Sequence, residues 1–363
     1  MSFFSVVIFI LILGLLIFIH ELGHFLAAKK NGVLVEEFGL GLPPRIFGKK
    51  IGETIYSLNL LPIGGFVKLY GEEYYEAEKK DSNKKGSIPP NRAFINKKPW
   101  QKLLIVIGGV IGNFFLGWFL FSILFIQGVP VPTDKLIVDQ VAKNSPAFYA
   151  GVKPKDIITS ITYQDKKYPL QKYDELASVT KKFLGKEILL SVKRNGATLD
   201  FPLVPRIKSP SGEGAIGLAF SSFIEKKYPW YQAPFLALIE AFKITKQIIV
   251  ELSKTLAKLI ILKKPAVEVS GPIGIARYTS KVIQFGVKAV LELIALLSFN
   301  LAIVNILPFP ALDGGHIVFI VYEWITKRKV NQKLERYLNL AGMALLLLIA
   351  FVVSINDIIK IYK

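Results

Sequence analysis

A stretch without any charged residue, residues 3–19, leads directly into the motif H-E-L-G-H at residues 20–24. A helix rises about 1.5 Å per residue, so the stretch and the motif together can cross a hydrocarbon layer about 30 Å thick. Residues four apart lie on one face of a helix, so His20 and His24 can bind the same metal ion. Glu21 can then take a proton from a water at that metal. The motif therefore predicts a metal site inside a membrane-spanning helix.

The alternative interpretation is a solvated cluster of His20, Glu21 and His24 near the end of a helix, without a ligand. Two of the three histidines in the chain lie at this spacing. Ionisable side chains inside an apolar segment are costly, and where they occur they normally mark a functional site. We therefore favour the metal site.

Composition indicates a membrane protein with several spans, because 52% of the 363 residues are hydrophobic. Lysines scattered through the loops that flank apolar segments contribute to the formal net charge of +19, and there they can meet anionic lipid headgroups. We find no basic patch interleaved with aromatic residues, so we expect no nucleic acid partner. The chain has no cysteine, which excludes disulfides and thiolate metal ligands. The first apolar stretch lacks the basic start and the cleavage site of a signal peptide.

Four membrane-spanning helices are predicted, at residues 1–28, 100–129, 281–325 and 338–358. In the second span, Gly108, Gly109 and Gly112 have the small-residue spacing that allows close contact between helices. Asn113 is its only strongly polar residue. It can form a hydrogen bond between helices or take part in the site, and the sequence does not separate these two roles.

The third span is interrupted by P-F-P at residues 308–310, followed by L-D-G-G-H at residues 312–316. Two prolines and two glycines predict an irregular segment that presents Asp313 at the depth of the first motif, where irregular backbone must line a cavity or be buried in protein. A site with two histidines needs a third ligand, and Asp313 is our candidate. The alternative is an aspartate that caps a helix or turn. His316 either supports the site or satisfies local backbone, and both remain open.

The positions of basic residues predict the topology of the chain. Lys29 and Lys30 follow the first span at once, so the positive-inside rule places residues 29–99 in the cytoplasm and the N-terminus outside. Basic residues in the loop 326–337 place that loop inside as well. Four crossings then return the C-terminus to the outside, and we expect both termini to be extracytoplasmic.

The cytoplasmic loop, residues 29–99, does not have a helical pattern. Glycines and prolines separate three short pieces of strand-forming residues, at 33–38, 54–60 and 66–70. We expect a small sheet against the membrane face of the metal site, followed by a charged, solvated linker at residues 73–98.

A second region, residues 134–222, has the pattern of a soluble α/β domain outside the membrane. It predicts a helix at 173–184 and a hairpin of 188–192 with 198–204 across Asn195-Gly196. Residues 223–280 follow as an extracytoplasmic helical region. Within it, charged residues interrupt 236–262 at every turn, which predicts an amphipathic helix on the outer leaflet and not a further span.

The soluble region resembles a PDZ domain through S-P-A-x-x-A-G, which starts at Ser145, and D-x-I-x-x-I, which starts at Asp156. PDZ domains add an extended peptide to the edge of a sheet. The resemblance therefore implies a peptide ligand for this region. The alternative is a spacer whose groove is closed.

The whole chain resembles the site-2 protease family of intramembrane zinc proteases, with the bacterial regulator-of-sigma-E protease type as the nearest branch. H-E-L-G-H and N-I-L-P-F-P-A-L-D-G-G-H carry this resemblance, together with L-P-I-G-G-F-V-K-L-Y-G-E at residues 61–72, R-A-F-I-N-K-K-P-W-Q-K, S-G-P-I-G-I-A and the final N-D-I-I-K. The resemblance implies that His20, His24 and Asp313 bind one Zn²⁺. It also implies that Glu21 is the general base and that Asn305 contacts the substrate backbone.

The same resemblance implies a polytopic protein of the bacterial inner membrane that cuts single-pass membrane proteins within their spans, such as anti-sigma factors or remnant signal peptides. The loop after the first span would hold the substrate extended. A catalytically silent membrane scaffold, with the PDZ-like region as a peptide binder, is the alternative from another class. A transporter is a weaker option, because we find no inverted repeat.

Overall fold

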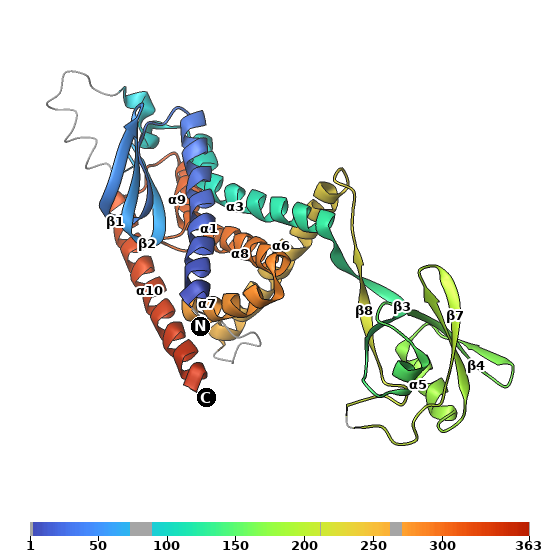
Figure 1. Ribbon diagram of the computed structural model, residues 1–363. Helices are drawn as coiled ribbons and strands as arrows, with labels where there is room; N and C mark the ends of the chain where they lie inside the picture. Colours follow the sequence, from blue (N-terminus) through green and yellow to red (C-terminus); the bar gives the residue numbers. More distant parts are fainter. Residues whose placement is uncertain (1–2, 73–88, 211, 262–270, 363) are drawn as a thin grey trace. The chain divides into compact units, whose positions relative to one another are not determined.

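The computed structural model describes residues 3–72, 89–210, 212–261 and 271–362 (Figure 1). The elements fall into two units. Unit 1 comprises Met1–Ile126 with Pro229–Lys363, and unit 2 comprises Gln127–Tyr228. The linker expected at residues 73–98 lies mostly outside the described residues, apart from two short 3-10 turns, η1 (Pro90–Arg92) and η2 (Phe94–Asn96).

Unit 1 contains the apolar helices. Four helices among the described residues are long and apolar enough to cross a membrane: α1 (Phe3–Lys30), α3 (Pro99–Gln127), α8 (Val287–Ile306) and most of α10 (Gln332–Tyr362). The prediction of four apolar spans is therefore confirmed. The fourth helix begins six residues earlier than predicted, at residue 332 in place of 338.

Close glycine contacts join α1 to α3. A Cβ atom on Gly23 would lie 2.1 Å from the carbonyl oxygen of Gly108, and one on Gly112 would lie 2.7 Å from that of Ile19. The two backbones thus approach at a distance that only glycine permits, as the small-residue spacing predicts. Beyond this contact, a core of apolar side chains fills the space among α1, α3, α8 and α6 (Ala233–Ile260): Ile12, Leu16, Leu120, Phe121, Ala237, Ala241, Ile294, Ala295 and Phe299.

The helix α6 packs on this core through small residues. Ala233, Ala237 and Ala241 are fully buried, whereas Phe242 and Ile249 are about half exposed. The indole of Trp118 on α3 donates to the carbonyl oxygen of Pro234 at 2.8 Å. The small residues of α6 therefore face the other helices. The bulky residues Phe242 and Ile249 are exposed, and such an apolar surface is suited to contact with lipid.

The predicted third span is a broken series of helices. Residues 281–325 contain the 3-10 turn η3 (Ile283–Phe285), α8 and α9 (Asp313–Thr326). The helix α7 (Pro272–Val282) precedes them and lies mostly in the predicted helical region 223–280. One detail of the prediction is wrong, because Asp313 is the first residue of α9 and not part of the irregular segment, which ends at Leu312. The two glycines do not break the helix. A Cβ atom on Gly314 would lie 1.9 Å from the Leu307 oxygen, so glycine lets the first turn of α9 pack on the bend before it.

The ends of α1 and α10 meet at α7. Ser280 on α7 donates to Ser5 near the start of α1 at 3.1 Å. Near the end of α10, the carboxylate of Asp357 accepts the N–H groups of Gly271 and Gly274 at 2.9 and 2.8 Å and so caps the start of α7. The start of α1 and the end of α10 therefore lie on one side of unit 1 (Figure 1).

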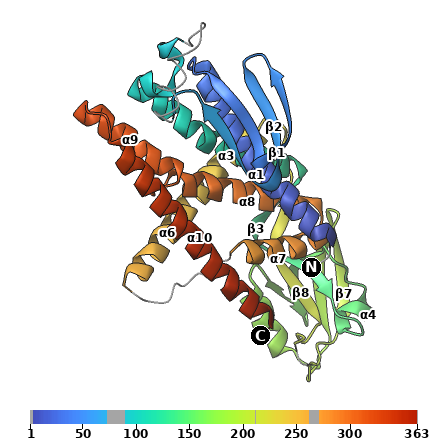
Figure 2. The same cartoon turned by 90° about the vertical axis from the view of Figure 1, so that its left-hand side faces the viewer.

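The loop after α1 forms two long strands, β1 (Val35–Ile51) and β2 (Thr54–Leu69), that pair with each other beside α1 (Figure 2). The three predicted strand pieces are therefore joined differently, since the pieces 54–60 and 66–70 belong to one strand. Residues 37–40 of β1 have partners both at 55–58 and at 65–68 of β2. A second apolar cluster, of Ala28, Val33, Val35, Leu69 and Ile105, fixes the base of this sheet between α1 and α3.

Unit 2 is a six-stranded antiparallel sheet in the order β7-β6-β4-β3-β8, with β5 paired to β4. Its strands are β3 (Val129–Val141), β4 (Ile157–Tyr163), β5 (Lys166–Pro169), β6 (Ile188–Arg194), β7 (Ala197–Leu203) and β8 (Leu218–Lys226), with helices α4 (Pro146–Ala150) and α5 (Tyr173–Lys182). The predicted helix and the hairpin across Asn195-Gly196 are present. The unit extends beyond residues 134–222 at both ends, because Val129 pairs with Lys226.

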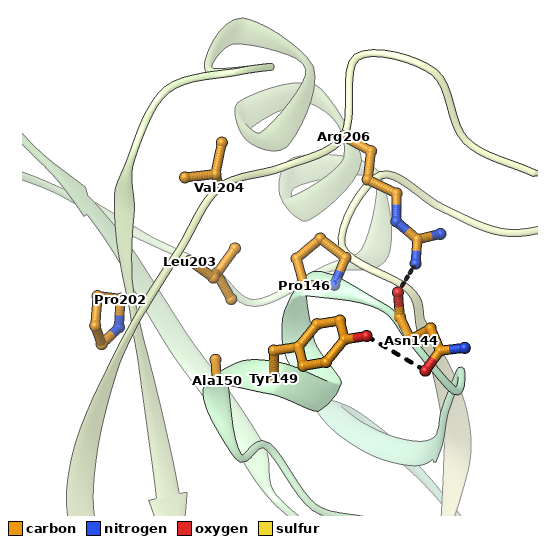
Figure 3. Close-up of a pocket in the computed structure, with 8 residues that line it drawn as sticks. All are labelled: Asn144, Pro146, Tyr149, Ala150, Pro202, Leu203, Val204 and Arg206. Atoms are coloured by element: carbon orange, nitrogen blue, oxygen red, sulfur yellow. Dashed lines mark hydrogen bonds between the residues drawn. The ribbon is translucent and has the colours of Figure 1, made fainter.

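Two concave regions lie on unit 2. One, of about 420 Å³, lies between α4 and the end of β7 (Figure 3). Its one cationic side chain, Arg206, is already paired, with Glu213 at 2.8 Å and with the carbonyl oxygen of Asn144. The other, of about 220 Å³, lies between α5 and β8.

A buried ion pair joins the strands and turns of unit 2. The carboxylate of Asp156, with 1% of its side chain exposed, accepts two bonds from Arg194 at 2.7 Å and one from the Lys153 N–H at 2.8 Å. Burial alone would raise the pKa of Asp156, but the hydrogen bonds from Arg194 and Lys153 outweigh it, so that the pKa lies below its usual value.

Candidate metal centre

The two histidines of the motif lie on one face of α1 with their rings close together. The ring centroids are 4.7 Å apart and the rings are nearly perpendicular. Their Nε2 atoms are 3.1 Å apart. The i, i+4 spacing thus brings two ligand nitrogens to one point, as the sequence predicts.

Asp313 completes this arrangement from a segment almost 300 residues away. Its Oδ2 atom lies 3.2 Å from His20 Nε2 and 3.4 Å from His24 Nε2. In the described part of the chain, these three residues are the group of His, Asp or Glu side chains whose ligand atoms gather closely enough to hold a metal ion. The tertiary structure therefore brings together the three residues proposed as ligands.

The chemistry of the three groups fits a divalent cation. Asp313 Oδ2 is inaccessible to solvent, yet it makes no hydrogen bond of acceptable geometry with the two ring nitrogens it faces. A buried carboxylate oxygen without a donor is costly, and a cation between the three atoms removes that cost. Two imidazoles and one carboxylate are the ligand set of a catalytic zinc site, which keeps one position open.

The helix α3 holds His24 from behind. His24 Nδ1 lies 2.9 Å from the carbonyl oxygen of Ile105, which can accept its proton and leave Nε2 free to bind a metal. At the next turn of α3, a Cβ atom on Gly109 would lie 2.4 Å from His24 Nε2 and 2.6 Å from His20 Cε1. Gly109 therefore provides the room for both rings. The sequence singled out Gly109 only for helix contact, and nothing in its spacing shows that the ligands fill the space.

Two asparagines flank His20. The amide nitrogen of Asn113 on α3 lies 3.2 Å from His20 Nδ1. The amide nitrogen of Asn305 on α8 lies 3.2 Å from His20 Nε2 and 3.5 Å from Nδ1. Asn305 is thus placed at the ligand-binding edge of the ring, whereas Asn113 lies behind it.

Glu21 faces the sheet. Its Cγ atom lies 2.9 Å from the position that a Cβ on Gly65 would occupy, and Ile17 Cγ2 lies 3.1 Å from it. The absence of a side chain at Gly65 lets β2 approach α1 next to the motif. The sheet therefore lies beside the predicted general base, as expected for the loop after the first span.

The remaining histidine, His316, points elsewhere. Its Nδ1 atom lies 3.4 Å from Glu335 Oε1 on α10. The sequence left two roles open, support of the site or satisfaction of local backbone, whereas this contact joins α9 to α10. A second link holds α9 to α3, where Lys102 Nζ lies 2.9 Å from Glu323 Oε2 and the lysine side chain is 5% exposed. Together these contacts fix the helix that begins with Asp313.

Comparison with known proteins gives a consistent result over the full chain. The family model described as Peptidase family M50 matches residues 8–349. A protein of Clostridium acetobutylicum named as a zinc metalloprotease is 36% identical over 99% of this chain and 98% of its own length. The Bacillus subtilis protein named "Regulator of sigma-W protease RasP" is 30% identical over 99% of both chains, and the Geobacillus kaustophilus "Zinc metalloprotease RasP" is 28% identical over 99% and 98%.

Proposed function

This chain belongs to peptidase family M50, the zinc metalloproteases of the site-2 type, and we propose that it cuts single-pass membrane proteins within their membrane-spanning segments. The observation that carries the proposal is the convergence of His20, His24 and Asp313 among apolar helices. A protease site in such a place meets substrates that are themselves in the membrane. The four apolar helices and the relatives are those of a multi-pass bacterial membrane protein.

The residues have separate roles in this proposal. His20 Nε2, His24 Nε2 and one carboxylate oxygen of Asp313 hold the zinc. When bound, zinc acts as a Lewis acid that activates a water and polarises the peptide carbonyl. The Glu21 carboxylate takes a proton from the attacking water and later delivers it to the nitrogen of the leaving amine.

The substrate must unwind before it is cut, because a helix uses its carbonyls in hydrogen bonds to its own backbone. We propose that it pairs with β2 near Gly65. Residues 65–69 of β2 have strand partners on one side, at residues 35–40 of β1, and no second strand among the described residues. Addition of an extended peptide to such an edge compensates for the helical bonds that the substrate loses. Asn305 then donates its amide N–H to a substrate carbonyl beside the site.

A substitution at Glu21 tests the reaction without removing a ligand. Glu21→Gln should keep one zinc per chain and lower the rate of cleavage of a reconstituted single-pass substrate by about 10²–10⁴-fold, the usual contribution of a general base. Glu240→Gln, on the exposed part of α6, is the matched control and should leave the rate unchanged. Normal turnover by the Glu21→Gln protein would show that this residue is not the base.

The rival proposal is a silent scaffold that binds peptides through unit 2 and uses its helices only as an anchor. Three converging ligands beside Glu21 have no role in such a protein. Metal analysis of the purified chain separates the two. A zinc content well below one per chain, with no change in stability after chelation, would support the scaffold.

We propose that both termini and unit 2 are extracytoplasmic, with residues 29–99 and 326–337 inside. The basic flanks support this orientation, and the meeting of both ends of the chain at α7 supports an even number of crossings. Because the chain has no cysteine, single cysteines can be placed at Lys208 and at Lys49 and labelled from each side. We expect Lys208→Cys to react from outside only. The opposite result would reverse the topology.

We also propose that unit 2 is a PDZ-like module that binds an extended peptide. Its sheet ends at β8, and the hollow of about 220 Å³ lies between that edge strand and α5. Apolar side chains from both elements line it, among them Leu176, Leu218 and Phe220. Strand addition at such an edge, with side chains of the peptide in the hollow, is the binding mode of PDZ domains.

The same module is proposed to exclude substrates with bulky external domains, so that another protease must cut them first. Anti-sigma factors and remnant signal peptides both have the required form, and the name of the Bacillus relative supports the former. Val129 at the start of β3 pairs with Lys226 at the end of β8. Replacing residues 129–226 by a short linker therefore removes both strands together. This deletion should allow cleavage of full-length substrates. If full-length substrates stay resistant while pre-cut ones are processed, the module is not the filter.

A further inference from the structure

Behind the proposed ligand His20 lies a fully buried amide on α3, and we propose that Asn113 is a positioning residue for the zinc site. It accepts the Nδ1 proton of His20 and so fixes the ring in the form that binds metal through Nε2. This inference rests on the ligand assignment proposed above. It gives Asn113 a role at the site, one of the two that the sequence left open.

The position of Asn113 is tightly defined. Its side chain is completely buried, and Ser298 on α8 donates to its backbone carbonyl at 2.7 Å. The nearest polar group of the site is His20 Nδ1, 3.2 Å from the end of the amide. Two helices therefore hold the amide against the rear nitrogen of the ligand.

Metal binding decides which end of the amide must face the ring. A neutral imidazole that binds a cation through Nε2 carries its proton on Nδ1, and that proton needs an acceptor. With the amide nitrogen at 3.2 Å, two donors would face each other when the metal is bound. A half-turn of the amide places Oδ1 there, and the contact becomes an N–H···O hydrogen bond.

The half-turn also changes the other end of the amide. Oδ1, where it now lies, is buried and no donor faces it. A buried oxygen without a donor is costly. With the ends exchanged, the oxygen has a donor in His20, and the amide nitrogen occupies the buried place.

The second histidine shows the same arrangement one turn away. His24 Nδ1 lies 2.9 Å from the carbonyl oxygen of Ile105 on the same helix. Ile105, Gly109 and Asn113 are spaced by four residues and form one line along α3. In this line, the carbonyl oxygen of Ile105 faces His24 and the amide of Asn113 faces His20. Gly109, between them, has no side chain and leaves room for both rings. The amide nitrogen of Asn305 lies 3.2 Å from Nε2 and 3.5 Å from Nδ1, so it is farther from Nδ1 than that of Asn113.

Zinc affinity, measured by competition with a chelator, tests the proposal independently of proteolysis. Asn113→Leu keeps the size of the side chain and removes the acceptor, and we expect its zinc affinity to fall about 10–100-fold, as for other partners of ligating histidines. Asn113→Asp restores an acceptor and should bind zinc within about threefold of the natural chain. Ser122→Ala, which removes a buried hydroxyl bonded within the same helix, is the control and should not change the affinity.

The visible spectrum of the Co²⁺-substituted protein supplies a second measurement. Asn113→Leu should alter the bands that report ligand geometry, and Asn113→Asp should keep them. If the leucine variant does not fold, Asn113→Ala takes its place in the same comparison with aspartate. Unchanged zinc affinity in the leucine or alanine variant, or equal losses in the aspartate variant, would overturn the proposal. Failure of the ligand assignment has a different signature, namely full zinc binding by Asp313→Asn.

Discussion

Two aspartates, one in each unit, lie in opposite surroundings. In unit 2 the Asp156 carboxylate is enclosed by Arg194 and the Lys153 N–H, with three hydrogen bonds of 2.7–2.8 Å. In unit 1 the Asp313 Oδ2 atom is buried against two imidazole nitrogens and forms no hydrogen bond. The charge of Asp156 is balanced by Arg194 of the same unit. The Asp313 Oδ2 atom has no such partner, which fits the proposed role of Asp313 as a metal ligand.

The comparison shows how a structural acid differs from a functional one. Burial alone does not distinguish them, since both are largely shielded from water. The difference is in the partners. A fixed guanidinium and a backbone N–H satisfy a carboxylate permanently, whereas two imidazole nitrogens leave room for an exchangeable positive charge. Substitutions at the two aspartates and at an exposed acid test this difference.

The largest effect is expected from Asp313→Asn. Loss of a direct ligand should weaken zinc binding by more than about 100-fold, since loss of outer partners already costs 10–100-fold. Zinc at 1,000 times the Kd of the natural chain should stabilise that chain by about 4 kcal/mol and this variant by no more than about 1.4 kcal/mol. Chelator competition and thermal unfolding with and without zinc measure the two quantities. Equal zinc affinity in variant and natural chain would place the metal elsewhere.

Asp156→Asn should have the reverse consequences. Zinc affinity should stay unchanged, while unit 2 loses about 2–4 kcal/mol, because Arg194 is left with a partner that is no longer charged. Alkylation of a cysteine placed at the fully buried Ala147 reports the opening of unit 2 in the intact, otherwise cysteine-free chain. Asp139→Asn, at an exposed position of β3, is the matched control. Equal alkylation rates for all three proteins would contradict the prediction.

Acid should act on unit 2 through the same residue. Hydrogen bonds hold the pKa of folded Asp156 below its usual value, against the effect of burial, while the unfolded chain has the ordinary pKa of about 3.9. The ion pair therefore contributes its full stability above about pH 4 and loses it as the pH falls toward the lowered pKa. Because the thiolate is the reactive form, the alkylation rate at position 147 is divided by the rate of a cysteine at the exposed position 208 at the same pH. This ratio should rise below about pH 4, and the rise should be smaller when Asp156→Asn is also present.

The smallest effect is expected at an exposed ion pair of unit 1. Arg92 and Lys29 hold the pKa of Glu53 to about 2, yet 42% of the Glu53 side chain is exposed. Water and salt screen such pairs, so Glu53→Gln should change stability by no more than about 1 kcal/mol. Thermal unfolding at low and high salt measures this. A difference in stability between the two proteins that persists in 1 M salt would show that the contacts of Glu53 with Lys29 and Arg92 stabilise the fold.

Predictions that depended on local spacing agree with the structure. The i, i+4 histidines, the four apolar spans and the hairpin across Asn195-Gly196 each depend on residues close together in the chain. Predictions that needed distant contacts were incomplete. The strand pieces around residue 60 are joined into β2, and β8 was missed because its partner β3 lies almost 90 residues earlier. Asp313 opens a helix because Gly314 packs on a carbonyl of the preceding bend.

A metal-binding motif within an apolar helix can be predicted from the sequence, because helical periodicity and hydrophobic length are properties of consecutive residues. The surroundings of the motif depend on the tertiary structure. It brought Asp313 within 3.4 Å of both histidines and left its oxygen without a donor. It also placed Ile105 and Asn113 beside the Nδ1 atoms of the rings and Gly109 against both rings. Those contacts join segments about 80 to nearly 300 residues apart, and packing of helices through glycine is what fixes them.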